Sequence, residues 1–401
     1  MVRVSLLVVG LVAVTTAPLV AAQQPVTRAE AIAAALARGA RAAFGRADTA
    51  RAAGVLRAAR AFPNPSLAAT YTKDVPHYHY IADLALDLPW LRSARIGAAA
   101  SARDAARYGF AFERAALRFD VDTAYTRALA AAAHARLSRR TASDADSLLR
   151  MARLRREVGD VSELDVRLAE VNAGQLENVA VDDSLAALDA LLGVQLAMGL
   201  PADTPGITLA DSLVPPPDSA PDDAGEPLRV AAAAASLSSE QRALTLAHRS
   251  LMPAPSVQVG IERSDPAEPS GTLLPTVGLS LALPFFNWNG GEIAQARAAR
   301  DRAQADLDLT RREAAADLSR ARRGLVAALT RLARDRRLLA SADRVAGMSL
   351  RAYAEGAIPL ANVLEAQRNA REALGRYVDD VALANDAAGA VRLLTATAAQ
   401  P

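Results

Sequence analysis

The sequence contains no cysteine and few aromatic residues. None of its 401 residues is cysteine, and 4% are Phe, Trp or Tyr. Folds held by disulfides are therefore excluded, and so is a lipidated N-terminal cysteine. Alanine is common, and it is the strongest helix former, with a side chain small enough for close helix packing. The composition therefore favours long packed helices over a bulky globular core.

An excess of charge of one sign is also missing. Lys and Arg number 46 and Asp and Glu 44, so no strong field points to nucleic acid. The arginine run from Arg320 to Arg337 carries a Leu/Ala seam, and we interpret it as the solvated face of a coiled coil. His77 and His79 share one face of an extended segment, which we interpret as a polar loop rather than a metal site.

Catalytic patterns are missing as well. No paired carboxylates, Ser/His arrangement or Gly-rich phosphate loop occurs with useful spacing. We therefore expect no enzyme, no cofactor and no bound metal.

Long apolar runs are confined to the N-terminus. Residues 1–22 contain Arg3, an apolar run from Val4 to Val14, and then small residues. This pattern predicts a signal peptide cleaved before Gln23. An uncleaved membrane anchor is the alternative, because the run to Ala22 approaches spanning length. No other segment has about 18 consecutive apolar residues, so no further membrane helix is predicted.

The rest of the chain contains an internal sequence repeat. The stretch "RAFPNPSLAATYT" matches "SLMPAPSVQVGIE" further along, and "RREVGDVSELDVRLAEVNA" matches "YAEGAIPLANVLEAQRNA". These matches predict two structural repeats, residues 23–200 and 228–401. A Pro/Asp-rich linker at 201–227 joins them.

Each repeat contains two short segments that alternate between apolar and other residues. Period two predicts strands at about 66–72, 81–88, 256–263 and 276–284. One face of these strands is expected to meet lipid, and its residues are Leu84, Leu86, Leu88, Val277, Leu279 and Leu281.

The remaining segments are helical. Residues 289–350 lack proline and carry a seven-residue Leu/Ala seam, as in coiled coils, and residues 93–155 are their counterpart. Returning helices are expected at 162–200 and 359–395. The turns between them, near 156–162 and 353–359, contain Gly159 and Gly356, which suit the left-handed conformation that ends a helix. The sequence therefore predicts one long helical hairpin, with a turn at its tip, in each repeat.

Four strands cannot close into a barrel within one chain. If their apolar face meets lipid, closure is compulsory, since no sheet edge survives in a bilayer. Three chains would supply twelve strands, enough to enclose an aqueous lumen. The predicted fold class is therefore mainly α with a small β part, in which three chains close a 12-stranded β-barrel. A soluble periplasmic coiled-coil adaptor or scaffold protein is the alternative.

This architecture resembles the TolC-type outer-membrane efflux factor family. The resemblance rests on the paired "P-x-P-S" strand starts, "LALPFFNWNGGEIAQARAARDRAQADL" and "YAEGAIPLANVLEAQ". It implies a homotrimer in the outer membrane of a Gram-negative-type bacterium, whose 12-stranded β-barrel continues as an α-helical tunnel into the periplasm. It also implies a tripartite efflux or secretion system, in which a periplasmic adaptor and an inner-membrane pump deliver substrates to the channel.

The resemblance also implies functional residues at the tips. Asn362 and Glu365 match the positions of an acidic entrance gate, although Asn362 is not acidic. Tyr353 and Asp165 match two partners of a latch between the tips, whose usual arginine is replaced by Ile358. Gly159 and Gly356 mark the tips expected to dock the adaptor. A solvated helix face around Glu365, and Asp165 as an acid in a first helical turn, are the plainer alternatives.

Overall fold

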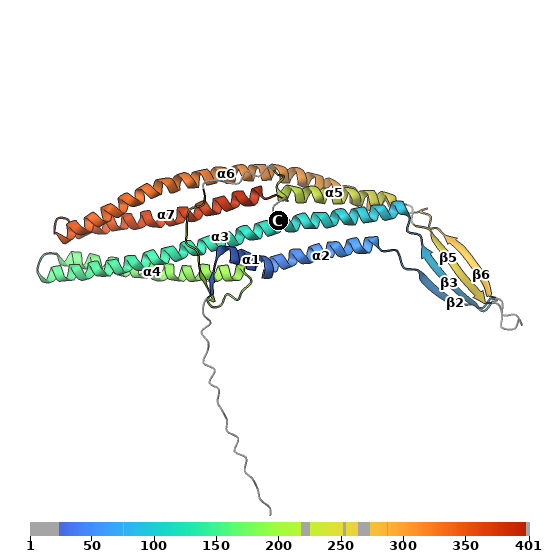
Figure 1. Cartoon of the computed structure of the whole chain (residues 1–401), viewed down its shortest axis with the longest axis horizontal. Helices are drawn as coiled ribbons and strands as arrows, with labels where there is room; N and C mark the ends of the chain where they lie inside the picture. Colours follow the sequence, from blue (N-terminus) through green and yellow to red (C-terminus); the bar gives the residue numbers. More distant parts are fainter. Residues whose placement is uncertain are drawn as a thin grey trace, which may run out of the picture.

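The chain forms a long rod with a β-sheet at one end and two helical tips at the other (Figure 1). The computed structural model describes residues 24–74, 76–217, 225–251, 254–263, 273–286 and 288–397. The predicted signal peptide, residues 1–22, lies outside the described residues.

The sheet contains two strands from each half of the chain. Its order is β2-β3-β5-β6, and all neighbouring strands are antiparallel. The strands are β2 (Ser66–Tyr71), β3 (Tyr78–Ala85), β5 (Ser256–Arg263) and β6 (Leu273–Ser280). Strands β2 and β6 are the two edges, and each leaves one side of its backbone without a neighbouring strand in the described sheet.

Two strands begin and end earlier than the sequence predicts. Strand β3 ends at Ala85 and β6 ends at Ser280, and both of these residues pair with Ser256. The ladder stops there because Ser256 is the first residue of β5 and follows Pro255, which has no N–H to donate. Leu86, Leu88 and Leu281 therefore lie beyond the strands. At the other end β3 begins at Tyr78, so His79 belongs to a strand and not to a loop.

Four long helices make the rod. They are α3 (Pro89–Glu157), α4 (Glu163–Ala197), α6 (Gly290–Ala354) and α7 (Leu360–Thr395). Helix α3 starts with a proline, whose missing N–H costs nothing in the first turn. At about 1.5 Å per residue, the 69 residues of α3 span roughly 100 Å. Three shorter helices complete the rod: α1 (Arg28–Arg38), α2 (Ala40–Arg60) and α5 (Leu228–Arg249).

The helices lie side by side in a row at each level of the rod. Near the sheet, extensive contacts give the order α2–α3–α5–α6. Towards the tips the order is α4–α3–α7–α6 (Figure 1). In both rows α6 is one edge, and α2 or α4 is the other. The sheet repeats this arrangement, because β2 and β6 are its edges.

Part of the predicted linker is a strand. β4 (Ile207–Leu209) pairs in parallel with β1 (Gln24–Val26) near the middle of the rod. Buried Gln195 holds the preceding turn, because its side chain donates to the carbonyls of Pro201 and Thr204 and accepts from the N–H of Gly206. These bonds, made by a residue outside the linker, order a segment whose composition indicates only a loop.

Candidate functional site

The two faces of the sheet differ in chemistry. Strand alternation and register place on one face only apolar and aromatic side chains, apart from Arg263. The other face carries a polar network, in which Asp83 accepts hydrogen bonds from Ser256 at 3.0 Å and from Gln258 at 2.9 Å. On that face His79 also lies 3.3 Å from a carboxylate oxygen of Glu262. The two faces of the sheet therefore differ in polarity.

Three of the predicted lipid-facing residues lie on the apolar face. Leu84 of β3 is opposite Val257 of β5, which is opposite Leu279 of β6, and Val277 lies on the same face. Val277 and Leu279 are 77% and 72% exposed, and Leu84 is also exposed. Among the described residues, these exposed side chains belong to no buried core cluster. Exposed aromatic side chains follow at the junction with the helices, namely Trp90, Phe285, Phe286 and Trp288.

A buried ion cluster fixes the junction between sheet and helices. The Asp87 side chain is 3% exposed and accepts from Arg92 at 3.2 Å and from Arg95 at 2.9 Å. The two arginines also donate to backbone carbonyls at the end of α2, and the Arg92 guanidinium lies 3.9 Å from the centre of the Phe62 ring. Because removing one partner of a buried ion pair is costly, this cluster fixes the segment between β3 and α3 against the end of α2.

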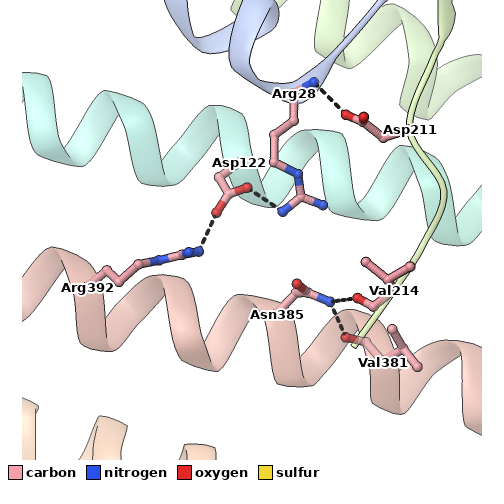
Figure 2. A network of polar contacts seen from close by, with 7 residues as sticks. All are labelled: Arg28, Asp122, Asp211, Val214, Val381, Asn385 and Arg392. Carbon is pink, nitrogen blue, oxygen red and sulfur yellow. Dashed lines mark hydrogen bonds and ion pairs between the residues drawn. The ribbon is translucent and has the colours of Figure 1, made fainter. Parts of the chain in front are cut away.

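A second polar network joins the two halves in the middle of the rod (Figure 2). Asp122 of α3 accepts from Arg28 of α1 at 2.7 Å and from Arg392 of α7 at 2.9 Å. The N–H of Arg28 donates to Asp211 at 2.7 Å. The Asn385 side chain of α7 donates to the carbonyl of Val214 in the linker. The first segment, both halves and the linker are therefore tied together at one level.

Both tips have the geometry that their glycines predict. Gly159 has φ +82° and Gly356 has φ +76°, the left-handed conformation that glycine adopts most easily. The two tips lie at the same level, because one apolar cluster contains Leu149 and Ala152 of α3 together with Tyr353 and Val363 of the second hairpin.

Tyr353 and Asp165, the predicted latch residues, form no hydrogen bond with each other in the single chain. The Asp165 carboxylate accepts from the N–H and the hydroxyl of Ser162, in a capping box at the start of α4. The Tyr353 hydroxyl is buried and has no hydrogen-bond partner among the described residues. Burial raises the pKa of Tyr353. In the single chain Asp165 therefore acts as a capping acid that satisfies N–H groups at the start of α4, and its role in a latch stays a prediction.

An arginine that the sequence analysis did not single out joins the tips instead. The Arg155 guanidinium donates to the Tyr353 carbonyl at 2.8 Å and lies 4.9 Å from the centre of the Tyr353 ring. Arg155 therefore links the two tips within one chain. Its place at the end of α3, opposite the second tip, could not be read without knowing that the tips lie level.

The predicted gate residues lie on α7 just beyond the second tip. Asn362 and Glu365 are both exposed on the chain. Glu365 lies 3.9 Å from Arg368 on the same helix, an exposed pair whose contribution to stability is small.

A carboxyl pair lies further along the second hairpin, between α6 and α7. Burial, together with a hydrogen bond to Asp335 of α6, raises the pKa of Asp380 to about 6. Arg331 acts in the opposite direction, and the neighbouring Asp379 adds to the increase. Asp379 also contacts His134 of α3 at 2.8 Å.

The described residues lack two other kinds of site. None of their helices combines the length and hydropathy that crossing a membrane requires. Within the same residues, no three His, Asp or Glu side chains gather where they could hold a metal ion.

Comparison with known proteins gives a family model that matches part of the chain, and a fold that matches most of it. Residues 226–397 match the family model described as outer membrane efflux protein. No curated protein matches the sequence. Several solved structures are similar over 92% of this chain.

Three of these structures illustrate the likeness. The outer membrane protein VceC of Vibrio cholerae has 16% identity, a TM-score of 0.75 and 95% of its own chain covered. The CmeC outer membrane channel of Campylobacter jejuni has 14% identity, a TM-score of 0.79 and 85% covered. The open state of the MtrE outer membrane channel of Neisseria gonorrhoeae has 13% identity, a TM-score of 0.72 and 88% covered. The resemblance predicted from the sequence and the mainly helical fold with few strands are both confirmed.

Proposed function

We propose that this chain is one protomer of a trimeric outer-membrane channel that conducts substrates across the periplasm and the outer membrane. One observation carries the proposal. The sheet and both rows of helices are each a single row whose two outer members have a neighbour on one side only. The sheet ends at β2 and β6, and the helical rows end at α6 and at α2 or α4. A row of this kind is completed by placing the next copy edge to edge.

A closed ring of copies satisfies all these edges at once. Head-to-tail contacts close when the rotation between copies closes, and three copies would give a 12-stranded barrel. The apolar face of the sheet, with Leu84, Val277 and Leu279, would face lipid, and the face with Asp83 and Gln258 would face a water-filled lumen. The helical rows would continue that lumen as a tunnel into the periplasm.

The tips would form the inner end of the tunnel. We place Glu365 of each copy around the axis as a negative constriction that favours cations, with Asn362 beside it adding polarity and no charge. The contact between Arg155 and Tyr353 would keep the two tips of a copy together. The turns at Gly159 and Gly356 would dock a periplasmic adaptor that connects the channel to an inner-membrane pump. The similarity of residues 226–397 to outer membrane efflux proteins supports this assignment.

Fractionation and conductance test the proposal together. The full-length chain should enter the outer-membrane fraction, require detergent, have the mass of three chains and conduct ions in planar bilayers. A monomer that stays soluble without detergent would refute the channel and favour the alternative, a periplasmic adaptor or scaffold.

A further inference from the structure

The arginine-rich part of α6 contains several arginines that have no acidic partner among the described residues. From Arg320 to Arg351 this helix contains nine arginines and two aspartates. Arg334, Arg337 and Arg344 are exposed, and none of them has an ion-pair partner among the described residues. Clustered like charges on one helix repel each other, so an unneutralised run favours contact with an acidic surface.

Helix α4 has the opposite charge. It contains one arginine, Arg167, and seven acidic residues, which are Glu163, Asp165, Glu170, Glu177, Asp182, Asp183 and Asp189. Arg167 already pairs with Glu163 and Glu170. Glu177, Asp182 and Asp189 are exposed and have no ion-pair partner in the described part of the chain.

These two helices are the opposite edges of one row, so they cannot reach each other within a chain. Building on the ring of the proposed function, we propose that the arginine run of α6 docks on the acidic helix α4 of a second copy. We assign Arg334 to Asp182 and Arg337 to Glu177 as the pairs of this seam.

The heights of these residues along the rod agree. Asp182 lies 23 residues beyond Gly159, and Arg334 lies 22 residues before Gly356. Glu177 and Arg337 lie 18 and 19 residues from the same glycines. At about 1.5 Å per residue, the partners of each pair differ in height by roughly 1.5 Å. Rotation about an axis along the rods preserves height, and the two tips lie level within a chain, so the pairs meet between copies.

Exposed apolar residues accompany the charges at coiled-coil spacing. On α4, Leu164, Val171 and Leu185 recur at multiples of seven residues and are exposed. On α6, Leu338 and Val345 are seven residues apart and exposed. A seven-residue recurrence on the outer face of a helix, away from its own core, is the pattern of a seam with another helix.

Charge reversal with rescue tests the seam. The chain carries Asp182→Arg with Glu177→Arg in one variant, Arg334→Asp with Arg337→Asp in a second, and all four changes in a third. Like charges facing each other should reduce the trimer fraction in detergent at low salt roughly tenfold in the first two variants. The third variant should recover most of the trimer. Arg140→Asp, an exposed change on α3 inside the row, is the matched control and should have no effect.

Cysteine crosslinking locates the contact directly, because the chain has no cysteine of its own. Asp182→Cys with Arg334→Cys should give disulfide-linked species of up to three chains on oxidation, and neither single change should. A wild-type trimer with unaffected reversal variants and no crosslink would overturn the seam and leave the channel standing. A wild-type chain that forms no trimer would overturn both.

Discussion

Removing the Arg155 side chain should open the tips of the molecule more than removing the Tyr353 hydroxyl. In Arg155→Ala the chain loses a charged hydrogen bond of 2.8 Å to the Tyr353 carbonyl, worth about 1.5–3 kcal/mol. It also loses a guanidinium 4.9 Å from the ring centre, worth about 0.5–1 kcal/mol at a partly exposed site. The free energy that keeps the two tips together should therefore fall by about 2–4 kcal/mol in each copy.

Tyr353→Phe should have the opposite sign or no effect. It removes a buried hydroxyl that has no partner among the described residues, and such a group carries an unrecovered desolvation cost of about 1–3 kcal/mol. The Arg155 guanidinium can still lie over the Phe ring, and the backbone carbonyl of residue 353 still accepts its hydrogen bond. The packing of the apolar cluster at the tips is kept.

Amide hydrogen exchange in residues 353–363 measures the local opening. Exchange in Arg155→Ala should be faster by at least about 30-fold, which corresponds to about 2 kcal/mol. Arg156→Ala, an exposed neighbour, is the control and should match the wild type. Equal opening in Tyr353→Phe and Arg155→Ala would refute the reasoning, because it would mean that the hydroxyl holds the tips.

Four further predictions follow from the sheet, the entrance, the carboxyl pair and the turns. Leu279→Arg, on the apolar face, should make folding into the membrane less favourable by about 2–4 kcal/mol near mid-bilayer, as measured by refolding into vesicles. Gln258→Arg, on the polar face, should have a much smaller effect. Glu365→Gln should lower the cation selectivity of the channel in planar bilayers, while Glu355→Gln should not. Asp380→Asn should raise Tm at about pH 8 and change it little below pH 4. The folded chain keeps a proton on Asp380 up to about pH 6, whereas the unfolded chain releases it near 3.8, so wild-type stability falls as pH rises through that window. Gly356→Val should weaken crosslinking to an adaptor without removing trimers, whereas Gly174→Ala, at an open helical position, should not.

Local patterns in the sequence were enough to predict most of the fold. Alternation located the four strands to within a few residues, and the glycines located both tips, because these features depend on neighbouring residues alone. Strand ends were less accurate, since the end of β3 depends on the proline before its partner β5. The strand β4 was missed because the bonds from Gln195 that order its approach come from another element.

The candidate site was harder to predict because it depends on which elements are neighbours. Asp165 and Tyr353 were correctly placed at the two tips, but their contact depends on side-chain directions that spacing does not give. Asp165 has Ser162 three residues before it, and this local partner is always within reach. Arg155 meets Tyr353 only because the two halves bring their tips level. Ser162, as a local partner in a capping box, competes with Tyr353 for the Asp165 carboxylate. In the single chain Asp165 accepts from Ser162.

The two long helices α3 and α6 show how position in a row shapes a repeated sequence. They are counterparts in the two halves, with 69 and 65 residues. Sixteen residues of α3 are buried and only seven of α6, because α3 lies inside both rows and α6 is an edge of both. A helix inside a row presents apolar or small residues on two sides, so less of its surface is free for charged residues. An edge helix has more free surface, and the run from Arg320 to Arg337 lies on α6, whose outer side packs against no other helix among the described residues. These arginines are exposed in the single chain, and in the proposed ring they would form the half of an interface that a second copy completes.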